Sequence, residues 1–247
     1  MSDVLLITGA SRGIGAACAV AGARKGYAIA VNYVSNENAA NRVVDEILSN
    51  GGSAAAIQGD VSKPAEIERI FSEADSMGRL AGLVNNAGIL DVAARLDEMP
   101  IDRLMRVLET NVMGSMVCAQ HAVRRMSTRH GGKGGGIVNL SSVAARLGAA
   151  GQYVDYATSK GAIDSLTIGL AREVAGEGIR VNAVRPGIID TEIHASGGFP
   201  DRVEKLKDTI PMKRGGTAEE VADGILWLLS DEASYVTGVV LDITGGR

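Results

Sequence analysis

A tyrosine and a lysine one helical turn apart are the residues of this chain best suited to proton chemistry. Tyr156 and Lys160 are four positions apart, so on a helix both side chains lie on one face. A free phenol titrates at about 10, and a cation about 4 Å away can lower that value by around three units at an effective dielectric of about 20. The pair can therefore move a proton to or from a carbonyl oxygen near neutral pH. The competing interpretation is a surface tyrosine and a solvated lysine on an ordinary helix.

Two serines upstream give this pair a chemical context. A strand-like apolar run at 137–140 ends in Ser141 and Ser142, and Ser142 lies fourteen residues before Tyr156. A serine hydroxyl can hydrogen-bond to a substrate oxygen. Tyr156 is also the only one of the five tyrosines with a lysine four residues later. The combination predicts an enzyme that reduces or forms C=O groups.

A glycine-rich turn near the N-terminus is the second chemical feature. An apolar run at 4–7 leads into Gly9, Gly13 and Gly15, and an alanine-rich helix follows to about Lys25. Glycines permit positive φ angles and let backbone N–H groups approach a pyrophosphate at a helix N-terminus. The spacing differs from G-x-G-x-x-G, so the dinucleotide fingerprint is matched in mechanism only. We predict a dinucleotide site here; a purely structural turn is the alternative.

Short apolar runs alternate with helical patterns along the whole chain. These runs lack polar alternation, as expected for strands of a parallel sheet covered by helices on both faces. No linker divides the sequence, so residues 1–247 are predicted to form a single α/β domain. The expected fold is a Rossmann-type doubly wound sheet of about seven parallel strands, at 4–7, 28–33, 54–58, 82–85, 136–140, 180–185 and 239–243.

Composition narrows the classes of partner. The formal net charge is −4 and no cluster of lysine or arginine is present, which disfavours nucleic acid and anionic membranes. The two cysteines, Cys18 and Cys118, fall in predicted helices and are expected to be buried thiols. None of the three histidines has metal-ligand spacing, so no metal is predicted. With no basic leader and no long apolar segment, a cytoplasmic location is expected.

These motifs together resemble the classical short-chain dehydrogenase/reductase family over essentially the whole length. The resemblance is strongest to carbonyl reductases of the 3-oxoacyl-carrier-protein reductase and glucose dehydrogenase types. The matching motifs occur in the family's order: Thr8-x-x-x-Gly-x-Gly, Asp60-Val61, Asn85-Asn86-Ala87-Gly88, Asn111, Ser142, Tyr156-x-x-x-Lys160 and Pro186-Gly187 with Thr191.

The resemblance assigns roles to the candidate catalytic residues. It implies that Tyr156 is the general acid in reduction and the base in oxidation, and that Lys160 binds the nicotinamide ribose and favours the phenolate. Ser142, rather than Ser141, would hydrogen-bond to the substrate oxygen. Asn111 would support a water and proton relay to Lys160, although a polar residue that only kinks its helix is an equal alternative. The implied cofactor contacts are Gly9, Ser11, Arg12, Gly13, Ile14, Gly15, Asn32, Tyr33, Ser35, Asp60, Val61, Asn86, Ala87, Gly88, Tyr156, Lys160, Pro186, Gly187, Ile189 and Thr191.

The end of the second strand favours NADP over NAD. An acidic residue there would accept hydrogen bonds from the adenosine ribose of NAD, but the chain has Asn32, Tyr33 and Ser35 around Val34. Arg12 in the glycine turn can meet a 2′-phosphate. Val34 stands where NADP-dependent members often carry a second basic residue, so NAD stays possible.

The resemblance also implies a substrate lid at about 192–212. It implies a homotetramer built from the long helices at about 101–129 and 153–177, together with the C-terminal strand and its neighbours. His194 in the lid can touch a small-molecule carbonyl or alcohol substrate. A regulator that binds NADP without catalysis is the alternative from another functional class, and the intact Ser142, Tyr156 and Lys160 argue against it. A nucleotide-sugar epimerase is disfavoured because it would need a longer C-terminal substrate domain.

Overall fold

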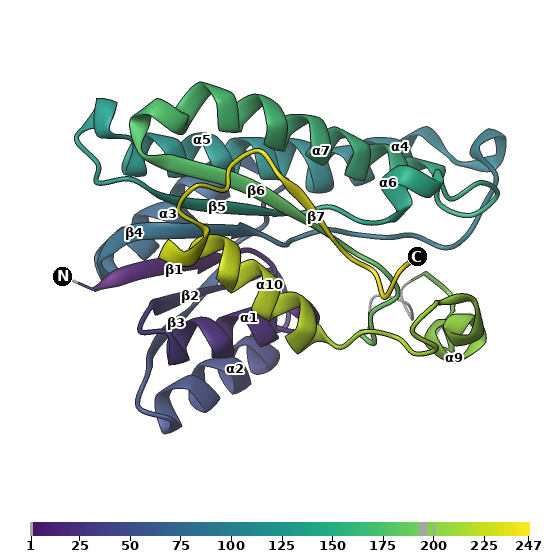
Figure 1. Ribbon diagram of the computed structural model, residues 1–247, viewed down its shortest axis with the longest axis horizontal. Helices are drawn as coiled ribbons and strands as arrows, with labels where there is room; N and C mark the ends of the chain where they lie inside the picture. Colours follow the sequence, from purple (N-terminus) through teal and green to yellow (C-terminus); the bar gives the residue numbers. More distant parts are fainter. Residues whose placement is uncertain (1, 193–196, 200) are drawn as a thin grey trace.

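Seven strands lie where the apolar runs predict them. The computed structural model describes residues 2–192, 197–199 and 201–247, and its strands form one parallel sheet in the order β3-β2-β1-β4-β5-β6-β7 (Figure 1). The predicted single-domain doubly wound fold is confirmed. The strands are β1 Asp3–Ile7, β2 Ala28–Tyr33, β3 Ser53–Gln58, β4 Arg79–Asn85, β5 Gly135–Leu140, β6 Ile179–Pro186 and β7 Val240–Ile243.

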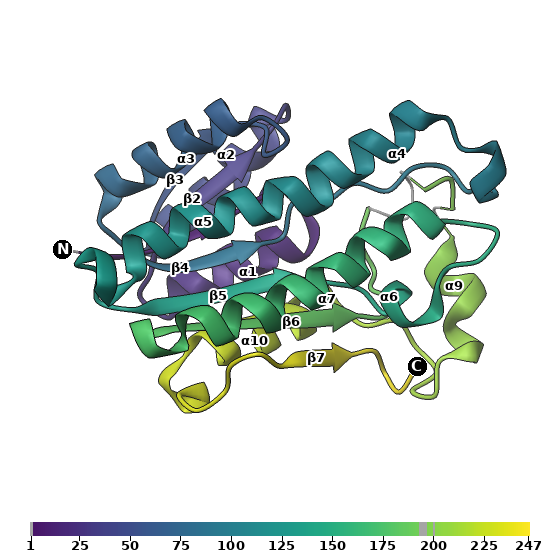
Figure 2. The same ribbon diagram turned by 90° about the horizontal axis from the view of Figure 1, so that it is seen from above.

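Helices cover both faces of this sheet (Figures 1 and 2). One layer holds α1 (Gly13–Arg24), α2 (Glu37–Ser49) and α10 (Ala218–Leu229). The opposite layer holds α3 (Pro64–Met77), α4 (Ile101–Leu108), α5 (Ser115–Met126) and α7 (Val154–Val174). Two short helices lie beyond the carboxyl edge of the sheet, α6 (Ala144–Leu147) and α9 (Arg202–Leu206). Single helical turns occupy Leu96–Glu98, Thr128–His130, Ala175–Glu177, Lys207–Thr209 and Asp231–Ala233.

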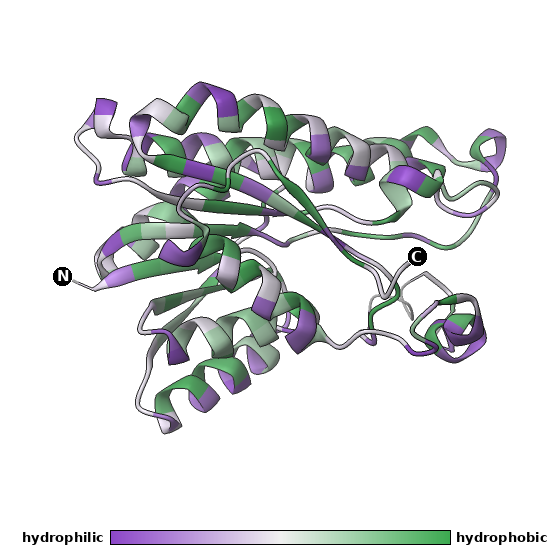
Figure 3. Cartoon of the chain, viewed as in Figure 1, coloured by the Kyte–Doolittle hydropathy of each residue, from purple (hydrophilic) through white to green (hydrophobic). Residues whose placement is uncertain are grey.

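The core is divided by the sheet because successive side chains of a strand point to opposite faces. In β1, Leu5 and Ile7 pack with the α1, α2 and α10 layer, whereas Val4 and Leu6 pack with the α3, α5 and α7 layer. All four side chains are fully buried. Figure 3 shows hydrophobic residues along the central strands. Burial on both faces explains why these strands read as unbroken apolar runs.

The long helix predicted at 101–129 is interrupted. Between α4 and α5, residues Glu109–Gly114 form a π-helical segment (η2), in which the hydrogen bonds span one residue more than in an α-helix. Asn111 lies in this segment and is completely buried. A π-helical turn redirects the side chains of a helix, and such turns are frequent at functional sites.

The strand order reverses between β1 and β4, the two strands that lie side by side at the centre of the sheet. In open parallel sheets, ligands bind at such a reversal, outside the carboxyl ends of the strands. Cys18 and Cys118 are buried free thiols, as predicted. Across the described ranges, no group of three or more metal-ligating side chains is placed to hold an ion, and no helix has the length and apolar character needed to span a membrane.

Candidate active site

The predicted catalytic residues meet beyond the carboxyl ends of β4, β5 and β6. Ser142, Tyr156 and Lys160 line a cavity of about 330 Å³. The loop after β5 contributes Ser142, and the first two turns of α7 contribute Tyr156 and Lys160. The same cavity is lined by predicted cofactor residues from three separate segments, namely Ile14, Asn86, Gly88, Pro186, Gly187, Ile189 and Thr191.

Ser142, and not Ser141, faces the tyrosine. Ser142 and Tyr156 are hydrogen-bonded through their side chains, and the Ser142 Oγ also accepts from the Ala144 N–H at 3.1 Å. Ser141 is 3 % exposed, and its hydroxyl donates to the Lys160 carbonyl at 3.2 Å. The Ser141 hydroxyl is therefore used to join β5 to α7, and the Ser142 hydroxyl is the one placed to share a ligand oxygen with Tyr156.

Lys160 is buried and points at a backbone carbonyl. Its Nζ donates to the Leu140 oxygen at 2.6 Å and lies over the Tyr156 ring, 5.6 Å from the ring centroid. Burial lowers the pKa of Lys160 to about 8, and the Asp164 carboxylate partly opposes this effect.

The expected effect of this ammonium on the phenol is not found. Burial raises the pKa of Tyr156 above its ordinary value, while the hydrogen bond with Ser142 acts in the opposite direction. The expectation rested on an ammonium close to the hydroxyl, but in the ligand-free protein Nζ lies over the ring and is turned toward Leu140. Tyr156 is thus a protonated phenol poised to donate rather than a preformed phenolate.

Asn111 joins the π-helical segment to the loop after β4 and to α7. Its Oδ1 accepts from the Ile89 N–H at 2.8 Å, and its Nδ2 donates to the Ile89 carbonyl and the Ser159 hydroxyl, both at 3.0 Å. A Cβ atom at Gly88 would lie 3.4 Å from Asn111 Oδ1 and 3.5 Å from Lys160 Nζ. Asn111 therefore lies next to Lys160 and fixes the loop after β4; its participation in a proton relay stays a prediction.

The glycine turn has the backbone that the sequence predicts. Gly9 and Gly13 have φ angles of 62° and 54°, in the left-handed region that favours glycine. A Cβ atom at Gly15 would lie only 2.6 Å from both the Gly9 oxygen and the Asn86 side chain. The Asn86 Nδ2 donates to the carbonyls of Thr8 and Gly9 at 2.8 and 2.9 Å, which links the loops after β1 and β4. The turn opens α1 at the strand-order reversal, where the N–H groups of a helix's first turn can meet an anionic ligand.

The Asn32 side chain is engaged in hydrogen bonds within the protein. Its side chain is 1 % exposed. It accepts from the Gly9 N–H at 3.2 Å and donates to the carbonyls of Ile57 and Gly59 at 3.2 and 3.0 Å. These three hydrogen bonds support the glycine turn, and a contact between Asn32 and a cofactor stays a prediction. Tyr33 is also buried, whereas Ser35 and Arg12 are exposed.

Two further predicted cofactor residues lie after β3. The Asp60 carboxylate accepts from the backbone and hydroxyl of Ser62 at 2.9 and 2.8 Å. Val61 is buried, and a Cβ atom at Gly114 would lie 2.7 Å from its carbonyl. These side chains shape the loop, which leaves mainly backbone and apolar surface for a nucleotide. The remaining residues of the predicted set, Ser11 and Ala87, lie in the loops after β1 and β4.

Two described residues of the segment predicted as a lid, Gly197 and Arg202, contact a tyrosine of the cavity wall. The Tyr153 hydroxyl donates to the Gly197 carbonyl at 2.9 Å, and the Arg202 guanidinium lies 5.3 Å from the centroid of the Tyr153 ring. Both Tyr153 and Arg202 line the cavity. His194, expected near substrate, lies outside the described residues, as do 193, 195, 196 and 200 of the same segment.

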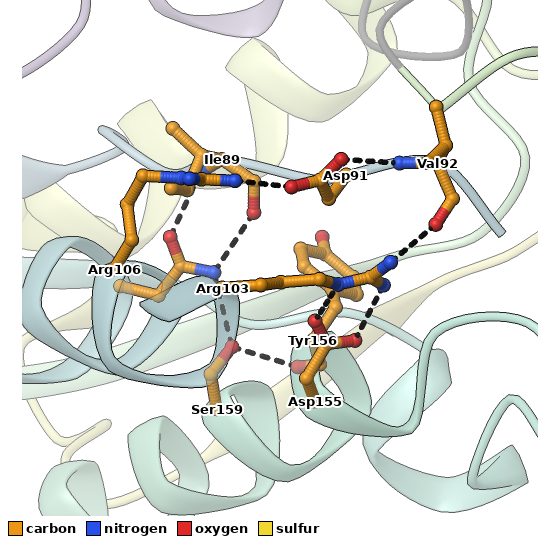
Figure 4. A network of polar contacts seen from close by, with 9 residues as sticks. Ile89, Asp91, Val92, Arg103, Arg106, Asp155, Tyr156 and Ser159 are labelled. Carbon is orange, nitrogen blue, oxygen red and sulfur yellow. Dashed lines mark hydrogen bonds and ion pairs between the residues drawn. The ribbon is translucent and has the colours of Figure 1, made fainter. Parts of the chain in front are cut away.

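A buried ion pair next to Tyr156 was missed by sequence reasoning (Figure 4). Arg103 of α4 holds Asp155 through two contacts, Nε to Oδ2 at 2.7 Å and Nη2 to Oδ1 at 3.2 Å. Its third nitrogen, Nη1, donates to the Val92 carbonyl at 2.6 Å. The side chains of Arg103 and Asp155 are only 5 % and 2 % exposed. The one available signal was an aspartate directly before Tyr156, and nothing in the sequence connects it to an arginine 52 residues earlier.

Comparisons with known proteins agree with this geometry. The family described as enoyl-(acyl carrier protein) reductase matches residues 9–247. A short-chain dehydrogenase/reductase from Serratia marcescens superposes with a TM-score of 0.90 at 34 % identity, covering 99 % of this chain and 97 % of that chain. The chain belongs to the short-chain dehydrogenase/reductase family.

Two curated relatives support membership of the family along the full length. An Escherichia coli protein described as the uncharacterized oxidoreductase YgfF is 54 % identical over 245 residues, covering 99 % of both chains. The 3-oxoacyl-[acyl-carrier-protein] reductase FabG of Staphylococcus epidermidis is 36 % identical over 249 residues, covering 100 % of this chain and 99 % of the relative. The predicted family is confirmed, and the protein is an oxidoreductase that acts on CH–OH or C=O groups with a nicotinamide cofactor.

Proposed function

We propose that this short-chain dehydrogenase/reductase is an NADP(H)-dependent enzyme that interconverts a carbonyl and an alcohol by hydride transfer, with Tyr156 as its acid–base residue. The observation that carries the proposal is the hydrogen-bonded pair of Ser142 and Tyr156 in the cavity, with the buried Lys160 beside it. A sensor that binds NADP without catalysis has no use for two convergent hydroxyls at this point. An NAD(H)-dependent enzyme of the same family is the closer alternative.

The chain's residues fit a dinucleotide. The left-handed backbone at Gly9 and Gly13 and the missing side chain at Gly15 shape the turn that opens α1. The N–H groups in the first turn of a helix have no partner inside the helix, which suits a pyrophosphate. Ile14, Gly88, Ile189 and Thr191 border the same cavity as Tyr156 and would hold the nicotinamide end. When bound, NADP(H) supplies or accepts the hydride. Ser142 would orient the substrate oxygen, and Tyr156 would donate a proton to it in reduction.

Three further proposals follow from the family. Residues 192–212 form a substrate lid over Tyr153, and the protein acts in the cytoplasm as a single NADP-binding domain, residues 1–247. The assembly is a homotetramer through α4, α5 and α7. Large apolar side chains exposed along α4, η2 and α5 support that assembly, among them Ile101 (70 %), Met105, Met113 and Met116.

The proposed reaction is tested by following NADPH absorbance with a panel of ketones, aldehydes, sugars and acyl thioesters. We expect the native protein to reduce at least one carbonyl class, and Tyr156→Phe that still binds NADPH to reduce the same compounds at least about a hundredfold more slowly. Loss of NADPH absorbance at equal rates with the native protein and Tyr156→Phe would contradict the proposal.

Arg12→Ala is expected to weaken NADPH binding by about tenfold to a hundredfold, because a charged hydrogen bond to a 2′-phosphate is worth about 1.5–3 kcal/mol. Arg12 is exposed at the N-terminus of α1, and its side chain makes no capping bond there. NADH binding should change little, since NADH has no 2′-phosphate. Fluorescence titration with both cofactors measures the difference, and equal losses for NADPH and NADH would refute this role of Arg12.

The efficiency with NADPH should fall as the pH rises through about 8, where Lys160 in the free enzyme loses its proton. Below that pH Lys160 is an ammonium and can donate to a ribose with its full charge; above it, a neutral amine binds more weakly. Tyr156 adds no falling limb here because its raised pKa keeps it protonated. The kcat/KM for NADPH against pH reports free-enzyme groups. Lys160→Arg should retain cofactor affinity into alkaline pH, and an identical alkaline limb in that variant would assign the limb to another group.

A further inference from the structure

Two arginines line the cavity at the end away from the glycine turn. Arg202 opens α9, and Arg247 follows β7. In both views the C-terminal segment approaches α9 (Figures 1 and 2). With Lys160 they give the cavity three basic side chains, and none of its lining residues in the described part of the chain is Asp or Glu. The side chains that line the cavity are therefore basic or neutral, although the whole chain has a formal net charge of −4.

Arg247 has a buried donor without a partner. Its Nη1 is out of contact with solvent and makes no hydrogen bond to any residue that the structure describes. The segment before it is held in place: the Met212 N–H donates to the Gly245 carbonyl at 3.1 Å, and Gly246 lies against Pro211. A buried charged donor left unpaired is unfavourable unless a ligand accepts from it.

In the described part of the chain, the Arg202 side chain contacts neutral groups. Its Nη2 donates to the Gln152 side chain at 3.1 Å, and its guanidinium lies over the Tyr153 ring. Nearby arginines at the same edge of the sheet are neutralised, since Arg146 and Arg185 both pair with Asp242, at 2.5 and 3.2 Å. No ion pair of Arg202 or Arg247 occurs among the described residues, so the two cavity arginines differ from their neighbours in carrying uncompensated charge.

We infer that the substrate is a carbonyl or alcohol compound that also carries an oxyanion, a carboxylate or a phosphate, which Arg247 and Arg202 bind. This inference rests on the proposed function, because the reacting carbonyl is the one that Ser142 and Tyr156 meet. Guanidinium groups suit both anions because their donors form a planar fork. Apolar residues of the same cavity, Leu147 and Ile188, would contact the carbon chain between the two polar ends.

Binding of matched pairs to the NADP⁺-saturated protein, measured by calorimetry, tests the inference. The carboxylate arm compares 4-oxopentanoate and 5-oxohexanoate with their methyl esters, and the phosphate arm compares dihydroxyacetone phosphate with dihydroxyacetone. We expect at least one anion to bind about tenfold to a hundredfold more tightly than its neutral twin. The arm in which this occurs identifies the oxyanion.

Variants distinguish anion binding by Arg202 and Arg247 from a general effect of the protein's charge. The double variant Arg202→Gln with Arg247→Gln should bind the anion and its neutral twin with affinities within about twofold of each other. Replacing Arg247 by lysine instead of glutamine in this double variant should restore part of the preference for the anion. Arg146→Gln is the matched control, because it removes a charge at the same edge from a side chain that pairs with Asp242 and does not line the cavity; it should leave the preference unchanged.

The inference is overturned if no anion binds more tightly than its neutral twin, or if the preference survives in the double variant. Reduction of neutral carbonyls without an anion preference would reject this inference and leave the proposed function intact. Anion binding that depends on Arg247 in a protein that reduces no carbonyl would reject the proposed function instead.

Discussion

Tyr156→Phe is expected to lower kcat by about 10²- to 10⁴-fold, the usual contribution of a general acid, while NADPH affinity stays within about twofold. The substitution removes one oxygen and keeps the ring that Lys160 covers. Because Tyr156 is hydrogen-bonded to Ser142 and its raised pKa keeps it protonated, we expect it to donate the proton to a bound carbonyl oxygen. Single-turnover reduction measures the chemical step, and fluorescence titration measures cofactor binding.

Tyr153→Phe is the matched control for this variant. Tyr153 lines the same cavity, but its hydroxyl donates to the Gly197 carbonyl instead of meeting Ser142. We expect a raised KM with a kcat near that of the native enzyme. If Tyr156→Phe keeps more than about a tenth of the native kcat, proton donation by Tyr156 is not needed for the reaction. Circular dichroism and thermal unfolding confirm that each variant is folded.

The sheet could be predicted because each strand is buried on both faces. Apolar runs such as 4–7 have no polar position that would suggest a solvent-facing side. The glycine turn between the run at 4–7 and the first helix needs a backbone conformation that few residues other than glycine adopt. Positive φ angles at Gly9 and Gly13 follow directly from that turn. These are local constraints, which a sequence contains in full.

The roles of buried polar side chains could not be read in the same way. Asn32 lies near the end of β2, where a ribose contact is expected, yet its amide is used by three backbone groups, from the loop after β1, from β3 and from the loop after β3. The π-helical segment at Asn111 depends on Ile89 and Ser159, which lie 22 and 48 residues away. Each contact joins segments whose separation is set by the whole fold, so residue types and spacing alone do not specify it.

The protonation states of Tyr156 and Lys160 also depend partly on local spacing and partly on the whole fold. Spacing correctly placed Lys160 and Tyr156 on one face of α7, but burial determines their pKa values. The cavity raises the pKa of the phenol and lowers that of the ammonium, because a low-dielectric environment disfavours both charged forms. A cofactor phosphate or ribose that binds near Lys160 would favour its ammonium, so we expect the working acid–base state to form only after the nucleotide binds.

Arg103→Met is expected to destabilise the fold by about 3–5 kcal/mol, because it leaves the Asp155 carboxylate buried without its cation. Val92 would lose its donor as well. Arg103 connects the loop after β4, whose Leu90 lines the cavity, to the residue directly before Tyr156 (Figure 4). At temperatures where the variant is folded, kcat should therefore fall more than cofactor affinity. Urea unfolding gives the free energy, and the split between kcat and NADPH affinity distinguishes positioning from general loss of structure.

Arg106→Met on the same helix is the matched control. Arg106 pairs with Asp91, but its side chain is 57 % exposed, and exposed pairs contribute about 0–1 kcal/mol. The double variant Arg103→Met with Asp155→Leu removes both buried charges, so it should recover most of the stability lost in Arg103→Met while kcat stays low. Recovery of kcat in the double variant would mean that the ion pair only stabilises the fold. Persistent loss would mean that the fork between Arg103, Asp155 and the Val92 carbonyl sets the geometry in which Tyr156 reaches its substrate.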